Sequence, residues 1–267
     1  MPVICIDSGQ DPRLIAYRNV PDAELLTRHG LFVAEGRLVV RRLLADSMLA
    51  TQSVMLTEVA MESLADVLLT RDGLPVYVVP QQVMNEVTGF NIHRGCLAIG
   101  QRPAPRSLVD VATNTRRLVA MERVGNADNV GAIFRNAAAV GADGILVGPS
   151  CTDPLYRKAI RTSMAATLTM PFADARPWPG VLADLHTEGW TVIAMTPSST
   201  ALPLADVADI VRGQRTVVVV GHEGEGLSTD SLAASSYQAR IPMAAGVDSV
   251  NVATAVAIAL YELTRNV

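Results

Sequence analysis

Apolar, β-branched runs alternate with helix-like segments through the second half of the chain, and no other feature constrains the fold as strongly. The run TVVVV at residues 216–220 is a clear example. Such strands are typical of a parallel sheet that helices cover on both faces. The sequence therefore predicts a doubly wound α/β domain, with ligand loops at the carboxyl ends of the strands. The expected strands are residues 118–122, 144–148, 190–196, 216–221 and 237–243, and the expected helices are residues 129–141, 153–166 and 249–263.

A smaller α/β unit is predicted for the first hundred residues. Its expected strands are residues 31–36, 53–57, 76–79 and 97–100, and its expected helices are residues 37–45 and 58–69. The stretch QRPAPRS is rich in Pro and Arg and has no periodicity, which is typical of a linker. We therefore expect a first domain at residues 1–100, a linker at residues 101–113 and a second domain at residues 114–267.

Composition excludes several classes of protein. Of the 267 residues, 49% are hydrophobic and 18% are charged, which indicates a globular protein. The formal net charge of −4 argues against nucleic-acid binding unless a basic patch is local. Cys5, Cys96 and Cys151 are far apart without histidine companions, so neither a disulfide framework nor a metal site is expected. The start MPVICIDSGQD lacks signal-peptide features and no run is long enough to span a membrane, so we expect a cytoplasmic protein.

The glycine-rich stretch GHEGEGLS, residues 221–228, follows the TVVVV run at a position where α/β proteins often bind phosphate. Its glycines have the order G-x-x-G-x-G, which fits neither a P-loop nor a dinucleotide-binding fingerprint. Glu223 and Glu225 lie between these glycines, and two carboxylates repel a polyphosphate at short range. The stretch therefore predicts a loop for a neutral or cationic ligand.

An amphipathic helix is predicted from residue 129, with Asn129 as a suitable N-cap. Arg135 lies off the apolar stripe of this helix. Its neighbours three and four positions away are Gly131, Ala132, Ala138 and Ala139. Such small side chains leave room for a bulky group to reach the guanidinium, although an isolated arginine of this kind is also typical of a solvated surface.

The last segment contains a strand, a turn with glycine and an Ala-rich helix that begins near Ser249. Ser249 and Asn251 are residue types that favour a helix start. The helix is apolar nearly all round, so we expect it to be buried, in part against another subunit. Taken singly, Glu223 is typical of a solvated loop charge. Ser228 and Ser249 have no His and Asp pattern that would make a nucleophilic triad.

Three segments in order carry a resemblance to a known family. They are Asn129 with Arg135, then G-x-E-x-x-G-L at residues 221–227, then IPM and SVNV within residues 241–252. Their order and separation resemble the three motifs of the SpoU (TrmH-like) RNA 2′-O-ribose methyltransferases of the SPOUT class, over about residues 118–263. The first domain, with VAEG at residues 33–36, resembles the L30e-like substrate-binding domain that precedes the catalytic domain in many members.

The resemblance implies S-adenosylmethionine as the methyl donor, bound in a deep trefoil knot made by the loops of the second and third motifs. Knots are almost absent among protein folds, and residue periodicity does not predict one. No metal is required for the implied reaction. The positions that match the donor-binding residues of the family are Thr196, Val220, Gly221, Ile241, Met243 and Val250.

The resemblance also implies roles for individual side chains. Arg135 matches the catalytic arginine of the family. A guanidinium keeps its proton, so we expect Arg135 to orient a phosphate and stabilise the developing alkoxide. Asn129, Glu223, Ser249 and Asn251 match residues that position the substrate and shape the site.

RNA is the implied partner, with ribosomal RNA favoured over transfer RNA by the L30e-like first domain, and family members are homodimers. Arg157, Lys158 and Arg161 lie on one expected helix and are candidates for phosphate contacts, although they also fit an ordinary solvated face. Four arginines near the linker are further candidates: Arg102, Arg106, Arg116 and Arg117. Two positions depart from the family pattern, since Ala127 replaces a usual proline and Val250 a usual leucine.

Two other functions stay open. One is an RNA-binding protein that keeps the fold but lacks activity, against which the presence of Arg135, Glu223 and Asn251 counts. The other is a nucleotide-dependent oxidoreductase on an ordinary doubly wound sheet, which the lack of G-x-G-x-x-G disfavours.

Overall fold

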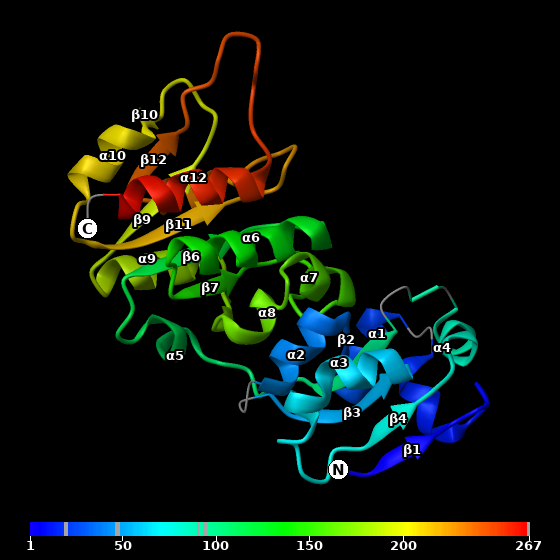
Figure 1. The fold of residues 1–267 in the computed structure, drawn as a ribbon. Coiled ribbons are helices and arrows are strands. Elements are labelled where there is room, and N and C mark those ends of the chain that lie inside the picture. Colours follow the sequence, from blue (N-terminus) through cyan, green and yellow to red (C-terminus); the bar gives the residue numbers. More distant parts are fainter. Residues whose placement is uncertain (19–20, 46–48, 90, 93–94, 266–267) are drawn as a thin grey trace. The chain divides into compact units, whose positions relative to one another are not determined.

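The computed structural model describes residues 1–18, 21–45, 49–89, 91–92 and 95–265. The chain divides into two compact units, drawn in Figure 1. Unit 1 comprises Met1–Ala104 and Pro154–Thr169, and unit 2 comprises Pro105–Asp153 and Met170–Val267. The segment Pro154–Thr169 thus packs in unit 1, although it falls within the range expected for the second domain. The roles expected for the two domains stay predictions.

Unit 1 contains a mixed sheet in the order β1-β4-β3-β5-β2. β5 pairs antiparallel with both of its neighbours, and β1, β4 and β3 are parallel. The strands are β1 (Val3–Cys5), β2 (Leu31–Glu35), β3 (Thr51–Leu56), β4 (Val76–Val78) and β5 (Cys96–Gln101). The helices are η1 (Pro12–Tyr17), α1 (Asp22–His29), α2 (Arg37–Ala45), α3 (Glu58–Leu68), α4 (Gln81–Thr88), α7 (Arg157–Thr162) and α8 (Ala166–Thr169). The predicted strands and helices of this unit are confirmed, whereas β1, η1, α1 and α4 were not predicted because they are short.

Unit 2 contains a seven-stranded sheet in the order β10-β12-β9-β11-β6-β7-β8. Every strand pair is parallel, which confirms the predicted fold class. The strands are β6 (Arg117–Met121), β7 (Gly144–Val147), β8 (Phe172–Asp174), β9 (Trp190–Met195), β10 (Leu202–Pro203), β11 (Arg215–Val220) and β12 (Tyr237–Arg240). The helices are α5 (Leu108–Ala112), α6 (Ala127–Val140), α9 (Gly180–Thr187), α10 (Leu204–Ile210), α11 (Thr229–Ala233) and α12 (Val252–Thr264).

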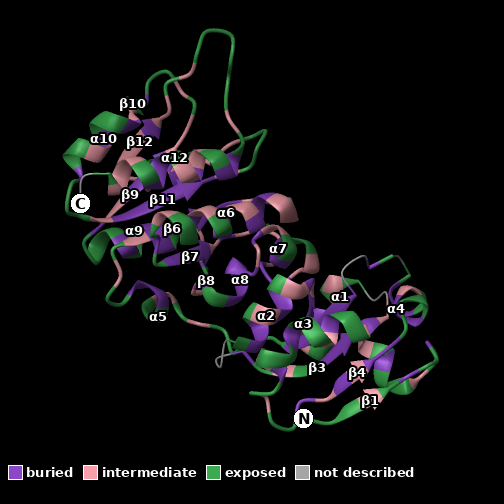
Figure 2. Ribbon diagram, in the orientation of Figure 1, coloured by how far each residue is buried: buried purple, intermediate pink, exposed green. Residues whose placement is uncertain are grey.

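Alternate residues of the unit 2 strands face the two helical layers, as the period of two in a strand requires. Val217 and Val219 pack in a core with side chains of α5 and α9. Their neighbours Val218 and Val220 therefore face the opposite layer, where α6 and α12 pack against each other in front of β11 (Figure 1). Figure 2 shows the central strands of this sheet almost entirely buried.

Three elements expected in the range of the second domain have other boundaries in the structure. The strand expected at residues 237–243 ends at Arg240, the helix expected at residues 153–166 is α7, and the last helix begins at Val252 rather than near Ser249. α12 is not buried all round within this chain, since Ile258 is 36% exposed and Tyr261 60% exposed. The trefoil knot stays a prediction. In the described part of the chain, no helix is long and apolar enough to cross a membrane.

Candidate functional site

α6 carries the first motif and begins two residues earlier than predicted. Its N-cap is Asn126, which has extended backbone angles and whose side chain accepts a hydrogen bond from the Asp128 amide at 2.9 Å. The prediction that Asn129 caps the helix is therefore wrong. Asn129 lies inside the first turn and is buried. Both asparagines suit a cap, and the packing of the turn selects the one outside it.

The side chains of Asn129, Glu223 and Asn251 form one hydrogen-bonded cluster. The Asn251 Nδ2 group donates to Asn129 Oδ1 at 2.9 Å and to Glu223 Oε1 at 3.0 Å. The Asn251 Oδ1 atom accepts from the amides of Ala253 and Thr254 at 2.9 and 3.3 Å, so Asn251 is also the N-cap of α12. One amide group thus caps a helix and links residues that are 122 and 28 positions away in the chain.

Arg135 lies on the same helix as Asn129 and is exposed. Its guanidinium makes no hydrogen bond or ion pair with any residue that the structure describes. The adjacent Asn136 Nδ2 group donates to the Ala253 carbonyl at 2.7 Å and ties α6 to the start of α12. A guanidinium on a fixed helix without a partner is available for a charge-assisted bond to an anionic ligand.

The loop at residues 221–228 turns tightly on itself. The Gly226 amide donates to the His222 carbonyl at 2.9 Å, and His222 Nδ1 accepts from the amides of Gly224 and Glu225 at 3.0 and 3.1 Å. A Cβ atom on Gly221 would lie 2.5 Å from the carbonyl carbon and oxygen of Gly226. Backbone cannot yield as a flexible side chain can, so the turn requires glycine at this position. The acidic side chains of the loop are exposed.

The expected donor-binding residues gather at one edge of the unit 2 sheet. Thr196 directly follows β9, Gly221 follows β11 and Ile241 follows β12. These strands are neighbours in the order β12-β9-β11, and the Thr196 amide donates to the Ala239 carbonyl at 3.0 Å. The carboxyl ends of neighbouring parallel strands meet at the same edge, so the three segments lie together there.

Residues 241–251 connect β12 to α12 as a long loop without regular structure, drawn in orange to red in Figure 1. Ile241, Met243 and Val250 are half-buried in this loop. Ser249 is exposed, and its side chain forms no hydrogen bond with the residues that the structure covers. The structure therefore leaves Ser249 outside the hydrogen-bonded cluster, and its expected role stays a prediction.

The basic residues expected to bind RNA lie on α7, within unit 1. The Arg157 amide donates to Asp22 Oδ2 at 2.9 Å, and the Arg161 guanidinium lies 3.6 Å from the Glu35 carboxylate. Partial burial raises the pKa of Asp22, and the positive charge of Arg157 offsets only part of this rise. Acidic partners therefore reduce the positive field of this helix, and Lys158 with the two arginines is only a modest basic patch.

Two charged residues that sequence analysis missed lie directly after β6. Glu122 is buried and accepts a hydrogen bond from the Ser228 amide at 3.2 Å. Arg123 Nη1 lies 2.6 Å from Glu225 Oε2. A signal was present in the sequence, because Glu-Arg ends the apolar run LVAM at the edge where ligand loops are expected.

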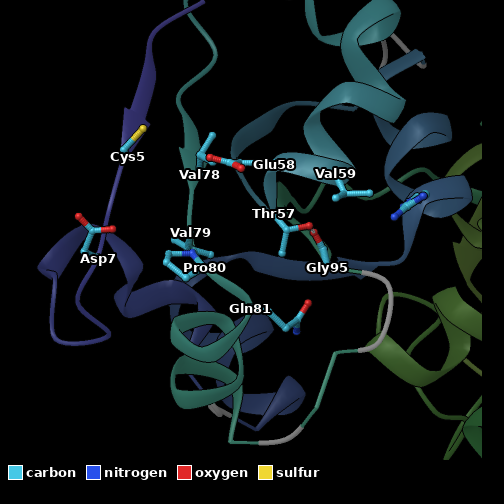
Figure 3. A pocket seen from close by; sticks show the side chains of 11 residues that line it. Cys5, Asp7, Thr57, Glu58, Val59, Val78, Val79, Pro80, Gln81 and Gly95 are labelled. Atoms are coloured by element: carbon cyan, nitrogen blue, oxygen red, sulfur yellow. Dashed lines mark hydrogen bonds between the residues drawn. The ribbon is translucent and has the colours of Figure 1, made fainter.

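A cavity of about 510 Å³ lies in unit 1, at the carboxyl ends of β1, β3 and β4 (Figure 3). Thr57 and Pro80, the N-cap residues of α3 and α4, both line it, so two helix amino-termini meet there. Arg37 adds a cation, and Asp7 and Glu58 add carboxylates. The cavity is large enough for a nucleotide and offers both signs of charge.

Known proteins are similar to this chain in sequence and in fold. Residues 116–261 match the model of the SpoU rRNA Methylase family. This range contains the seven-stranded parallel sheet and the hydrogen-bonded cluster of Asn129, Glu223 and Asn251 at its carboxyl edge. The match covers more than half of the chain. The chain belongs to the SpoU rRNA methylase family.

Three similar proteins match nearly the whole chain. An uncharacterized tRNA/rRNA methyltransferase of Mycobacterium tuberculosis is 40% identical over 260 residues, which are 96% of this chain and 90% of the relative. An AdoMet-bound rRNA methyltransferase from Sinorhizobium meliloti has a similar structure, with a TM-score of 0.84 and 25% identity over 99% of this chain and 98% of that chain. The SpoU methyltransferase AviRb from Streptomyces viridochromogenes shares the fold, with a TM-score of 0.79 and 22% identity over 96% and 98% of the two chains.

Proposed function

We propose that this protein transfers a methyl group from S-adenosylmethionine to a ribose 2′-hydroxyl of RNA. The observation that carries the proposal is the hydrogen-bonded cluster of Asn129, Glu223 and Asn251, in which Asn129 lies on α6, the helix that also presents Arg135. Residues from three distant segments meet there with hydrogen-bond geometry. Arg135 is exposed and has no partner among the described residues.

The edge formed by β12, β9 and β11 is the proposed binding site for S-adenosylmethionine. The half-buried side chains of Ile241, Met243 and Val250 offer an apolar wall for the adenosine, and Thr196 and Gly221 offer backbone groups. The neighbouring loop is acidic, and a carboxylate environment suits a positively charged sulfonium. When bound, this cofactor supplies a methyl group that is already activated for transfer.

The side chains of the site would align the acceptor. Arg135 would hold an RNA phosphate and stabilise charge that develops on the ribose oxygen, because a guanidinium is a cation with several N–H donors. The cluster of Asn129, Glu223 and Asn251 would fix the second and third motif segments relative to α6. Alignment of this kind can account for a large part of a rate enhancement without a further catalytic group.

We propose ribosomal RNA as the substrate, ahead of transfer RNA. Support comes from the Sinorhizobium meliloti rRNA methyltransferase, which is similar over 99% of this chain and thus over both units. In unit 1 the cavity beside Arg37 and Thr57 would receive an unpaired nucleotide, since proteins read RNA mostly through exposed single-stranded bases. α7 would add phosphate contacts through Arg157, Lys158 and Arg161.

We further propose that the protein acts as a homodimer. α12 has a mixed surface in this chain, with Ile258 and Tyr261 exposed beside a buried row that includes Val256 and Leu260. Ile258 and Tyr261 lie three positions apart and thus on one face of the helix, and neighbouring exposed apolar side chains can mark a surface that a second subunit covers. Sedimentation of the purified protein would give its mass in solution.

The experiment that tests the proposal is transfer of a labelled methyl group from S-adenosylmethionine to RNA, followed by mapping of ribose methylation in RNA from cells with and without the gene. We expect label on ribosomal RNA with the wild type and none with Arg135→Ala. Arg212→Ala is the control, because Arg212 lies on the surface, where it forms an ion pair with Asp209 at 2.6 Å. Full activity in Arg135→Ala would refute the role of Arg135. Absence of S-adenosylmethionine binding by calorimetry would favour an inactive RNA-binding protein.

A further inference from the structure

Two residues at the end of β6 hold the loop at residues 221–228 from outside. Arg123 Nη1 lies 2.6 Å from Glu225 Oε2, and its Nη2 group donates to the Gly226 carbonyl at 3.3 Å. Glu122 Oε2 accepts from the Ser228 amide at 3.2 Å. The last part of the loop is therefore held at Glu225, Gly226 and Ser228 by two adjacent residues that directly follow β6.

The position of Glu122 follows from the alternation along β6. Leu118 and Ala120 pack in the core that also contains Leu227. Glu122 continues this alternation, so its side chain faces the same side of the sheet and reaches the start of α11. The carboxylate is buried, and its second oxygen lies 3.7 Å from the Arg123 Nε atom. A buried carboxylate needs such partners, because its charge is otherwise poorly solvated.

Arg123 has an unusual backbone for its residue type. Its φ angle is +56°, in the left-handed region that favours glycine. Its amide donates to the Pro149 carbonyl at 2.9 Å, which keeps the backbone in this conformation. Strained backbone of this kind persists where the surrounding structure requires it, and it is frequent at functional sites. The conformation directs the guanidinium to the loop after β11.

Glu225 and Gly226 lie close to the two residues of the loop with proposed roles, Gly221 and Glu223. Gly226 packs against Gly221, where a Cβ atom would meet its carbonyl at 2.5 Å, and Gly221 is the expected contact of the methyl donor. Two residues before Glu225, the Glu223 carboxylate accepts from Asn251 at 3.0 Å. A shift of Gly226 would therefore move the donor wall and the link to α12 together.

We propose that Glu122 and Arg123 are positioning residues that hold the loop at residues 221–228 in its donor-binding conformation. This inference rests on the proposed function. Arg123 neutralises Glu225 and fixes the Gly226 carbonyl, and Glu122 fixes the end of the loop. With the loop held from outside, the Glu223 side chain is directed to Asn251 and the Gly221 backbone faces the sheet edge.

The alternative is an ordinary surface ion pair, since the side chains of Arg123 and Glu225 are 33% and 70% exposed. Exposed ion pairs contribute little to stability, so this alternative predicts that removal of the pair leaves binding of the donor unchanged. Arg212 and Asp209 form such a pair in the same unit, at the same distance of 2.6 Å and with exposures of 53% and 66%. Arg212→Ala is therefore the matched control.

The test compares Arg123→Gly, Arg123→Lys and Arg212→Ala with the wild type. Glycine accepts the positive φ angle, so we expect Arg123→Gly to melt within about 2 °C of the wild type. We expect the amides of residues 224–228 to exchange with deuterium about tenfold faster in this variant. Its affinity for S-adenosylmethionine, measured by calorimetry, should fall about tenfold. Arg123→Lys keeps the charge but not the two-pronged contact, so its exchange and affinity should lie between the two.

Arg123→Gly with loop exchange and donor affinity within about twofold of the wild type would overturn the proposal, as would equal effects in Arg212→Ala. A wild type that binds S-adenosylmethionine but does not methylate RNA would overturn the proposed function while the exchange and affinity data still support the positioning role. A wild type that does not bind this donor would overturn both. In steady state, a positioning role predicts a raised KM for the donor with a smaller change in kcat.

Discussion

Substitution of Asn251 separates the two functions of its amide, namely helix capping and the link between motifs. Asn251→Ser keeps an oxygen that can cap α12 but loses the donor to Asn129 and Glu223. The buried Asn129 carbonyl is then left without its partner, which costs about 1–3 kcal/mol in proteins. Asn251 is itself exposed, so water can reach the gap and the lower end of that range, about 1 kcal/mol, is expected. Asn251→Ala also loses the cap, which adds about 1 kcal/mol.

Urea unfolding followed by tryptophan fluorescence measures these differences for unit 2 alone. Both tryptophans of the chain, Trp178 and Trp190, lie in that unit. We expect the free energy of unfolding to fall in the order wild type, Asn251→Ser, Asn251→Ala, in steps of about 1 kcal/mol. Methyl transfer should fall about tenfold already in Asn251→Ser, because Glu223 loses its partner.

A double-mutant cycle with Asn129→Ala tests the link directly. If the two asparagines interact, the effects of Asn129→Ala and Asn251→Ser are not additive, and the second substitution adds little to the first. Unfolding of Asn251→Ser within about 0.3 kcal/mol of the wild type, together with an additive cycle, would refute the reasoning.

The close packing at Gly221 and the burial of Cys96 give three further predictions. Gly221→Ala would place a Cβ atom 2.5 Å from the Gly226 backbone, about 0.9 Å closer than an ordinary contact of about 3.4 Å. We therefore expect the free energy of unfolding to fall by about 1–3 kcal/mol and calorimetry to show weaker binding of S-adenosylmethionine. An affinity for this donor equal to that of the wild type would contradict the prediction. Burial raises the pKa of Cys96 from 9.0 to about 12, whereas Cys5 is exposed. At pH 8 a thiol reagent should therefore label Cys5 rapidly and Cys96 only on unfolding, and early label on Cys96 in a peptide map would contradict the burial. Since the folded pKa is raised, the contribution of Cys96 to stability is present below the unfolded pKa and is lost as the pH rises from about 9 towards 12.

Much of the fold of unit 2 was determined by the sequence alone. A run such as TVVVV at residues 216–220 is apolar on both faces, and only a strand covered on both sides by helices satisfies it, so the parallel sheet followed from local pattern. Taken singly, Arg135, Glu223 and Asn251 are typical of a surface or a helix start, and only the resemblance of their three segments to the SpoU motifs implies one site. The structure brings two of them into one hydrogen-bonded cluster with Asn129.

Tertiary structure decided what local pattern left open. Asn126 rather than Asn129 caps α6, because packing buries the first turn and local preference is equal for the two asparagines. The contacts of Glu122 and Arg123 join residues more than 100 positions away, and no periodicity carries information over such a distance. The sequence specifies which residues can bind and cap, but the meeting of strand ends at one edge decides which of them touch.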